Sequence, residues 1–126
     1  MKENNWLFFA DEDLMVAKLS LKENIFNQVC FHSQQCVEKS LKAYLSEKEN
    51  KVPRVHTLVN LLKRCARRDS RFMQFLDCCK GLDRYYIPTR YADVLPGNLP
   101  NGLPDEKDAN KAIEIAKRIF EFVGKI

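Results

Sequence analysis

Four polar residues in the stretch FHSQQCVEKSLKAYL (31–45) are spaced so that they could act together. Gln35, Glu38, Lys39 and Lys42 recur at three- and four-residue intervals, so a helix would place them on neighbouring tracks of one outward face. That face can bind a polar ligand or a partner protein. It can equally be a solvated face with a Glu38–Lys42 pair, which stabilises an isolated helix by about 0.2–0.5 kcal/mol.

The stretch YYIPTRYADV (85–94) brings tyrosines, a proline and an arginine close together. Arg90 offers a planar set of donors suited to phosphate. Tyr86 and Tyr91 offer rings for a base and hydroxyl groups for a phosphate or ribose. These are the residue types of a nucleotide site. Alternatively, the tyrosines cover the end of a helical bundle, and Arg90 pairs with Asp93 or with the helix that carries Glu38.

A basic cluster follows in the middle of the chain, at Lys63, Arg64, Arg67, Arg68 and Arg71. Cations near the C-terminal end of a helix interact favourably with its dipole, which accounts for some of them. The remainder, with the net charge of +4, permits an anionic partner at the surface.

The chain offers no convincing metal ligand set. His32 and Cys36 stand four residues apart on a predicted helix, but two ligands do not make a zinc site, and no paired CxxC motif is present. We therefore expect no metal and no cofactor, with the five cysteines reduced, small and buried. No run approaches the roughly 18 apolar residues of a membrane helix, and the first residues do not resemble a signal peptide. We expect a cytoplasmic protein without a membrane partner.

Apolar residues recur at helical spacing along most of the chain, and strand alternation is not convincing anywhere. Helices are predicted over about 4–21, 24–47, 56–68 and 71–86, and a last one follows a cap at Asp105 and stops near Gly124. The first helix carries a stripe with Phe9 in it and Asp13 at its edge. Three prolines and two glycines make 94–104 a long loop, which could close over a ligand. The expected fold is an all-α up-and-down helical bundle of four to five helices in one domain, residues 1–126.

The strings FHSQQCVEKSLKAYL, HTLVNLL, YYIPTRYADV and DANKAIEIAKRIFEFV, in this order and at these separations, resemble the HEPN family (higher eukaryotes and prokaryotes nucleotide-binding domain). The resemblance spans nearly the whole chain. It implies a helical bundle that often forms a homodimer and, in prokaryotes, works beside a separate small nucleotidyltransferase as its nucleotide- or substrate-binding partner. The matching positions are Gln35, Glu38, Lys39, Lys42, Tyr86, Arg90, Tyr91 and Asp93. His56 matches the histidine that opens the third helix, where a local role is the simplest expectation.

The resemblance favours a non-enzymatic module that binds a nucleotide or RNA, in a pair of the toxin–antitoxin kind. Another branch of the family cuts RNA without a metal and uses an arginine followed four to six residues later by a histidine. That motif is absent, since neither His32 nor His56 has an arginine at this distance before it. A metal-independent RNase toxin is therefore the second hypothesis, because a proton-transfer group is missing. A helical module that only docks a protein is the third.

Overall fold

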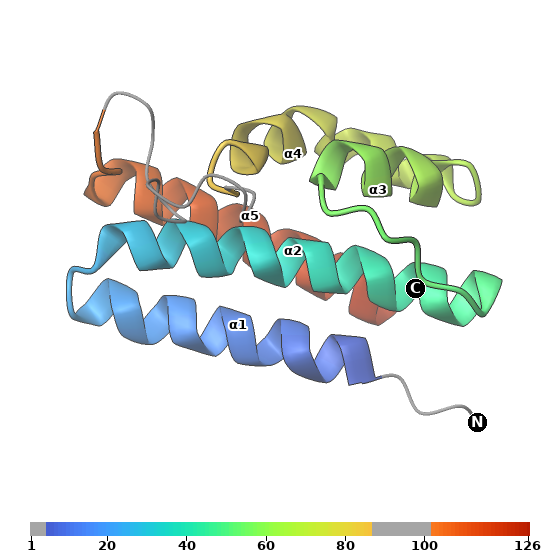
Figure 1. Cartoon of the computed structure of the whole chain (residues 1–126), viewed down its shortest axis with the longest axis horizontal. Coiled ribbons are helices and arrows are strands. Elements are labelled where there is room, and N and C mark those ends of the chain that lie inside the picture. Colours follow the sequence, from blue (N-terminus) through green and yellow to red (C-terminus); the bar gives the residue numbers. More distant parts are fainter. Residues whose placement is uncertain (1–4, 87–101) are drawn as a thin grey trace.

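The structure is a computed structural model that describes residues 5–86 and 102–126. Every regular element in these ranges is a helix, which confirms the all-α class and the expected number of α-helices (Figure 1). The elements are α1 (Asn5–Lys22), α2 (Phe26–Glu49), α3 (Leu58–Ala66), the 3-10 helix η1 (Ser70–Phe75), α4 (Leu76–Asp83) and α5 (Glu106–Lys125). Arg90, Tyr91, Asp93 and most of the predicted loop 94–104 lie outside the described residues.

The longest helix, α2, is the centre of the bundle. It packs against α1, α5, α3 and α4, and Figure 1 shows α1 on one side of it and the short helices on the other. Its predicted apolar stripe is buried, from Val29 to Tyr44. Because neighbours cover most of its circumference, polar residues outside the stripe are buried as well, among them Gln34, Glu38 and Lys42. The expectation that Glu38 and Lys42 lie on an outward, solvated face is therefore wrong.

The short helix α3 runs in the same direction as α2. His56, just before α3, lies beside Glu38 in the middle of α2, whereas Arg64, near the end of α3, binds Glu49 at the end of α2. The connection 50–57 therefore returns along α2 before α3 begins (Figure 1). Short connections favour antiparallel neighbours, and the hairpin between α1 and α2 follows that rule. The polar connection that contains Pro53 is long enough for α3 to run parallel to α2 instead.

Side-chain caps fix where several of these helices begin. Asp105 forms a reciprocal capping box with Asp108 at the start of α5, which confirms the predicted cap, and the Asp69 carboxylate accepts from the backbone N–H of Arg71 at the start of η1. The segment predicted as one helix over 71–86 is instead η1 followed by α4.

The first turn of α3 is capped by a residue from another helix. Its N-cap, Thr57, makes no side-chain hydrogen bond. The Asp83 carboxylate at the end of α4 instead accepts from the backbone N–H groups of Leu58 and Val59, at 2.7 and 3.1 Å. Burial raises the pKa of Asp83, and these two hydrogen bonds offset part of that rise. Asp83 thus ties the position of α3, and with it that of His56, to α4.

The outer face of α1 is apolar and uncovered. Ala10, Leu14 and Ala17 are buried as the stripe predicts, but Phe9 is exposed, because the buried side of the helix is rotated toward Asp13. We call the exposed residues Phe8, Phe9, Met15, Val16 and Leu19 the α1 apolar face.

Four of the five cysteines are buried as expected, and Cys78 is half-buried. None is in a disulfide. Burial raises the pKa of Cys30 to about 11 and that of Cys36 and Cys65 to about 12. These groups are therefore neutral thiols near pH 7, and they act as small apolar side chains in the core.

Candidate functional site

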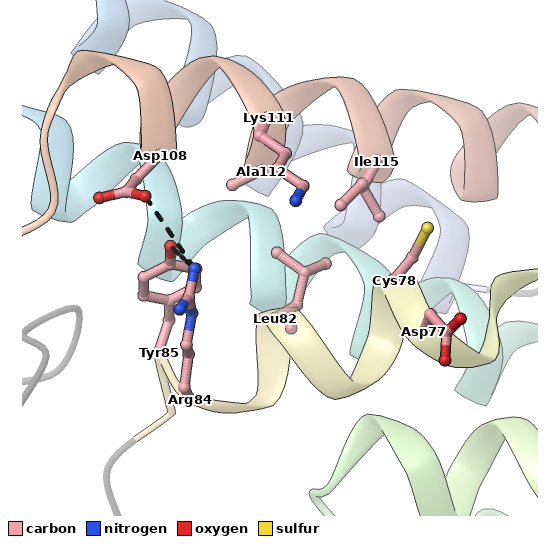
Figure 2. Close-up of a pocket in the computed structure, with 10 residues that line it drawn as sticks. Asp77, Cys78, Leu82, Arg84, Tyr85, Asp108, Lys111, Ala112 and Ile115 are labelled. Atoms are coloured by element: carbon pink, nitrogen blue, oxygen red, sulfur yellow. Dashed lines mark hydrogen bonds and ion pairs between the residues drawn. The ribbon is translucent and has the colours of Figure 1, made fainter.

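A cavity of about 200 Å³ lies between α4 and α5 (Figure 2). At one end of it, Arg84 donates to the Tyr85 hydroxyl at 3.2 Å and lies 4.0 Å from the Asp108 carboxylate. Lys111 and Asp77 also line the cavity. Two cations and two carboxylates give this lining no preference for a ligand of either charge. No described residue of the predicted site lines it.

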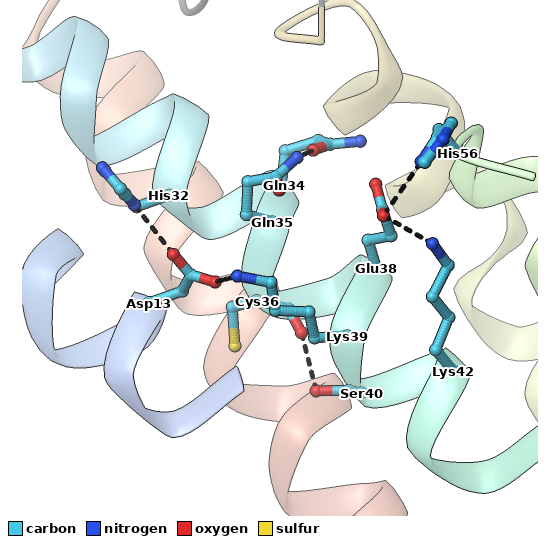
Figure 3. A network of polar contacts seen from close by, with 10 residues as sticks. All are labelled: Asp13, His32, Gln34, Gln35, Cys36, Glu38, Lys39, Ser40, Lys42 and His56. Carbon is cyan, nitrogen blue, oxygen red and sulfur yellow. Dashed lines mark hydrogen bonds and ion pairs between the residues drawn. The ribbon is translucent and has the colours of Figure 1, made fainter. Parts of the chain in front are cut away.

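The four polar residues of α2 fall into two separate clusters (Figure 3). Lys39 points toward α1, where Asp13 lies, whereas Glu38 and Lys42 point toward the start of α3. Gln35 lies between them and donates from its amide to the Gln34 Oε1 atom at 2.7 Å. The helical spacing placed these residues on neighbouring tracks correctly, but the tracks face different partners.

In the first cluster, Asp13 of α1 accepts from Lys39 Nζ at 2.6 Å and lies 2.9 Å from His32 Nδ1. Burial raises the pKa of Asp13, but the hydrogen bonds and charges of His32 and Lys39 outweigh it, so the pKa is lowered overall. The contacts of the carboxylate therefore stabilise the fold above its ordinary pKa, near 3.8, and this contribution is lost as the pH falls through the lowered value. Lys39 thus links α2 to α1, and the Asp13 carboxylate neutralises its charge.

In the second cluster, Lys42 Nζ donates to Glu38 Oε2 at 2.9 Å. Their side chains are only 6% and 7% exposed, so this predicted pair is an interior ion pair and not the surface pair that its spacing suggested. Lys42 Nζ also lies 5.4 Å from the centre of the Trp6 ring on α1. Lys42 has to leave both partners before it can reach a phosphate.

His56 contacts the Glu38 member of the buried pair and is itself half-exposed to solvent. Its Nδ1 atom lies 3.3 Å from Glu38 Oε2, and its side chain is 53% exposed. Its ring stacks on Tyr86, with centroids 5.9 Å apart and 23° between the planes. The expectation of a purely local role at the helix start is therefore wrong for His56, because it joins α2 to the end of α4 across the start of α3.

One oxygen of Glu38 remains unused by its neighbours. Within residues 5–86 and 102–126, the buried Oε1 atom accepts no hydrogen bond. A buried acceptor without a partner costs about 1–3 kcal/mol, so this oxygen favours any donor that can reach it. The half-buried carboxylate of Asp83 lies near enough for the charge of Glu38 to raise the Asp83 pKa further. The Glu38 site, which we define as Glu38, Lys42, His56 and Tyr86, is therefore a polar cluster with unmet acceptor capacity.

The basic cluster is only partly free. Arg64 and Arg68 both donate to the Glu49 carboxylate, and Arg71 forms a bidentate pair with Asp69. Lys63 and Arg67 are exposed and have no ion pair in the part of the chain that the structure describes. Three of the five cations thus have specific carboxylate partners, in addition to the favourable interaction with the helix dipole.

The described residues contain neither a metal-binding cluster nor a membrane-spanning helix. No three histidine, cysteine, aspartate or glutamate side chains in 5–86 and 102–126 are grouped so that they could hold a metal ion. No helix in these ranges is long and apolar enough to cross a membrane.

Asp13 and Asp83 organise this region, yet sequence reasoning gave neither a place in the site. The sequence did indicate a role for Asp13, because a carboxylate at the edge of an apolar stripe needs a partner on the facing helix. It gave no such indication for Asp83, because its partners are backbone groups 24 and 25 residues away in sequence.

The geometry defines an all-helical bundle that carries its polar site on the central helix, where the short α3 begins. The chain belongs to the HEPN domain family, whose model matches residues 4–126. It is similar to a protein of Methanocaldococcus jannaschii named "Putative toxin MJ1304", with 30% identity over 123 residues, which cover 90% of this chain and 80% of that protein.

Two solved structures have the same fold. ST0689, described as an archaeal HEPN homologue, is 32% identical and has a TM-score of 0.76, with 99% of this chain and 98% of that chain covered. TT1696 from Thermus thermophilus is 29% identical and has a TM-score of 0.80, with 98% of each chain covered. The similarity therefore extends over the whole described fold.

The buried pair predicts a specific pattern of stabilities. Replacing Lys42 with Met leaves the Glu38 charge buried without its cation, so we expect K42M to lose about 3 kcal/mol of unfolding free energy in urea. The double variant E38Q/K42M removes both charges, and we expect it to recover most of that loss. K48M removes an exposed lysine from the same helix and should cost less than about 1 kcal/mol. A double variant no more stable than K42M would contradict the pairing.

Proposed function

We propose that this chain is a HEPN module that binds a nucleotide or an RNA phosphate at the exposed edge of the Glu38 site. The observation that carries the proposal is the stacked pair His56–Tyr86, half-exposed above a buried carboxylate with an unused oxygen. A base can extend such a stack, and base–aromatic stacking contributes about 1–3 kcal/mol.

The roles of the remaining predicted residues change under this proposal. Lys39 and Lys42 already bind carboxylates, so their charges position neighbouring helices and are not the first contacts of a phosphate. The Nε2 atom of the half-exposed His56 ring, which does not face Glu38, takes that place. Arg90, Tyr91 and Asp93 stay a prediction from the sequence, as phosphate and base contacts supplied by residues outside the described ranges.

Titration calorimetry with AMP and with a short uridine oligonucleotide tests the binding proposal. We expect the wild type to bind at least one of them, and we expect H56A and Y86A each to weaken binding about tenfold or more through loss of the stack. Y86F keeps the ring and should bind nearly as well as wild type. H32A, which removes the histidine of the Asp13 cluster, is the matched control. Wild-type affinity in the H56A/Y86A double variant would refute the proposal.

A second function, RNA cleavage without a metal, is favoured by one specific contact. Glu38 holds the Nδ1 side of the half-exposed His56 ring and leaves the other ring nitrogen uncommitted to it, which is how a carboxylate orients a histidine for proton transfer. His56 would take the proton of a ribose 2′-hydroxyl while its oxygen attacks the phosphorus. The P–O5′ bond breaks, and the leaving 5′-oxygen takes a proton from water. The products are a 2′,3′-cyclic phosphate and a 5′-hydroxyl. The name of the M. jannaschii relative agrees with a toxin of some kind.

Cleavage is testable with purified protein, RNA and EDTA. If the second function holds, the wild type cuts RNA in the chelator and leaves cyclic phosphate ends, and H56A reduces the rate by a factor of about 100 or more. H32A should cut at the wild-type rate. Intact RNA after prolonged incubation with folded protein that binds it would leave the binding function as the answer.

The α1 apolar face supports the expected homodimer. Phe8, Met15 and Leu19 are 60%, 57% and 56% exposed, and their spacing puts them on one side of the helix. The first half of α1 carries Asp11 and Glu12, and the second half carries Lys18 and Lys22. Two copies of α1 packed antiparallel would bury the apolar residues and bring opposite charges together.

Light scattering after size exclusion tests this interface. We expect a dimer for the wild type and a monomer for M15K/L19K, with little change in melting temperature because both positions are exposed. M73K, a substitution at an exposed methionine in η1, should stay dimeric. A wild type that is monomeric at micromolar concentration would overturn the interface. A small nucleotidyltransferase as a further partner stays a prediction from the family resemblance, and co-purification of the two chains would test it.

A further inference from the structure

The positive charge of the chain is concentrated in one segment. Residues 47–71 contain eight of the 21 lysines and arginines but three of the 17 acidic residues, so this segment carries +5 and the remainder of the chain −1. The segment comprises the end of α2, the connection to α3, α3 itself and the start of η1. The net charge of the protein is therefore the charge of one region.

Four cations of this region are available to a ligand. Lys51, Arg54, Lys63 and Arg67 are exposed, and none forms an ion pair within residues 5–86 and 102–126. We call these four residues the basic track. The excess charge nearby is larger still, because Arg64 and Arg68 share the one carboxylate of Glu49.

The basic track connects the Glu38 site to the end of the bundle. Two contacts fix its ends: His56 lies on Glu38, and Arg64 and Arg68 lie on Glu49. Glu38 and Glu49 are eleven residues apart on α2, roughly 17 Å at 1.5 Å per residue. The connection with Lys51 and Arg54 covers this distance in one direction, and α3 with Lys63 and Arg67 covers it in the other (Figure 1). Cations thus follow both chain segments that lead to His56.

We propose that the basic track and the Glu38 site together bind one single strand of RNA, so that the ligand is an oligonucleotide and not a mononucleotide. This inference rests on the proposed function, since one end of the strand lies at His56 and Tyr86. Along the axis of a stacked strand there is one phosphate for about every 3.4 Å, so roughly five of them span the track. The exposed aromatic stack at its end accepts a splayed base, which a single strand offers and a duplex does not. An acidic peptide would match the cations but has no base for the stack.

Binding of uridine oligonucleotides of 2, 6 and 12 residues, measured by fluorescence anisotropy at several salt concentrations, tests the track. We expect the 6-mer to bind at least tenfold more tightly than the 2-mer at low salt, with little further gain for the 12-mer. In K51Q/R54Q/K63Q/R67Q, the slope of log affinity against log salt for the 6-mer should fall by about 2.8, at 0.7 per lost phosphate contact. The affinity for the 2-mer should stay near that of the wild type.

The control removes the same charge elsewhere. K80Q/K107Q/K111Q/K125Q neutralises four exposed lysines on α4 and α5, and we expect its salt slope to change by less than about one. An equal fall in slope in both variants would reduce the effect to net charge and overturn the track. So would polyglutamate competing as strongly as the RNA 6-mer, or unchanged 6-mer binding in H56A/Y86A.

The two proposals fail in different ways. If the 2-mer binds at His56 and Tyr86 but the 6-mer binds no better, the track is wrong and the nucleotide-binding function stands. If folded wild-type protein binds neither AMP nor any oligonucleotide, the proposed function itself is wrong.

Discussion

The buried ion pair between Glu38 and Lys42 is the interaction on which the candidate site depends. A central helix with neighbours on most sides has little room for charge, and removing one partner of an interior ion pair leaves the other charge buried at a cost of about 3–5 kcal/mol. Here Lys42 lies between Glu38 and the Trp6 ring, and His56 shares the same Glu38 oxygen. The pair therefore connects α1, α2 and the start of α3, and it gives His56 one position although half of the histidine is in solvent.

The position of the short helix α3 depends on this arrangement. At nine residues it is too short to be stable by itself, so its position is set by contacts with its neighbours. Glu38 meets the chain before its first turn, Asp83 caps that turn from α4, and Glu49 binds Arg64 and Arg68 at its end. Three carboxylates from two other helices thus place α3 along α2. The same placement brings the cations of the basic track and the exposed His56 close to one another along α3 and the connection before it.

The sequence predicted the helices and their apolar stripes because the 3.6-residue period survives in a single chain without tertiary information. It predicted the cap at Asp105 for the same reason, since this cap and its partner Asp108 are three residues apart. The burial of Glu38 and Lys42 was not predictable in this way. A Glu and a Lys four residues apart are usual on a solvated ridge, and the neighbours that meet this pair are distant in sequence, namely Trp6 on α1 and His56, eighteen residues after Glu38. The parallel course of α3 likewise depends on contacts between distant residues.

Binding and cleavage make different demands on the same residues, and the burial of each residue separates them. Glu38 is interior and ion-paired, so its loss would disturb the fold together with either proposed function. His56 is held by that carboxylate but exposed, and its replacement removes the stack and both ring nitrogens without opening the core. Both proposed functions therefore depend on His56, whose ring would serve a binder as an aromatic surface and a nuclease as a base. The carboxylate beneath it serves both.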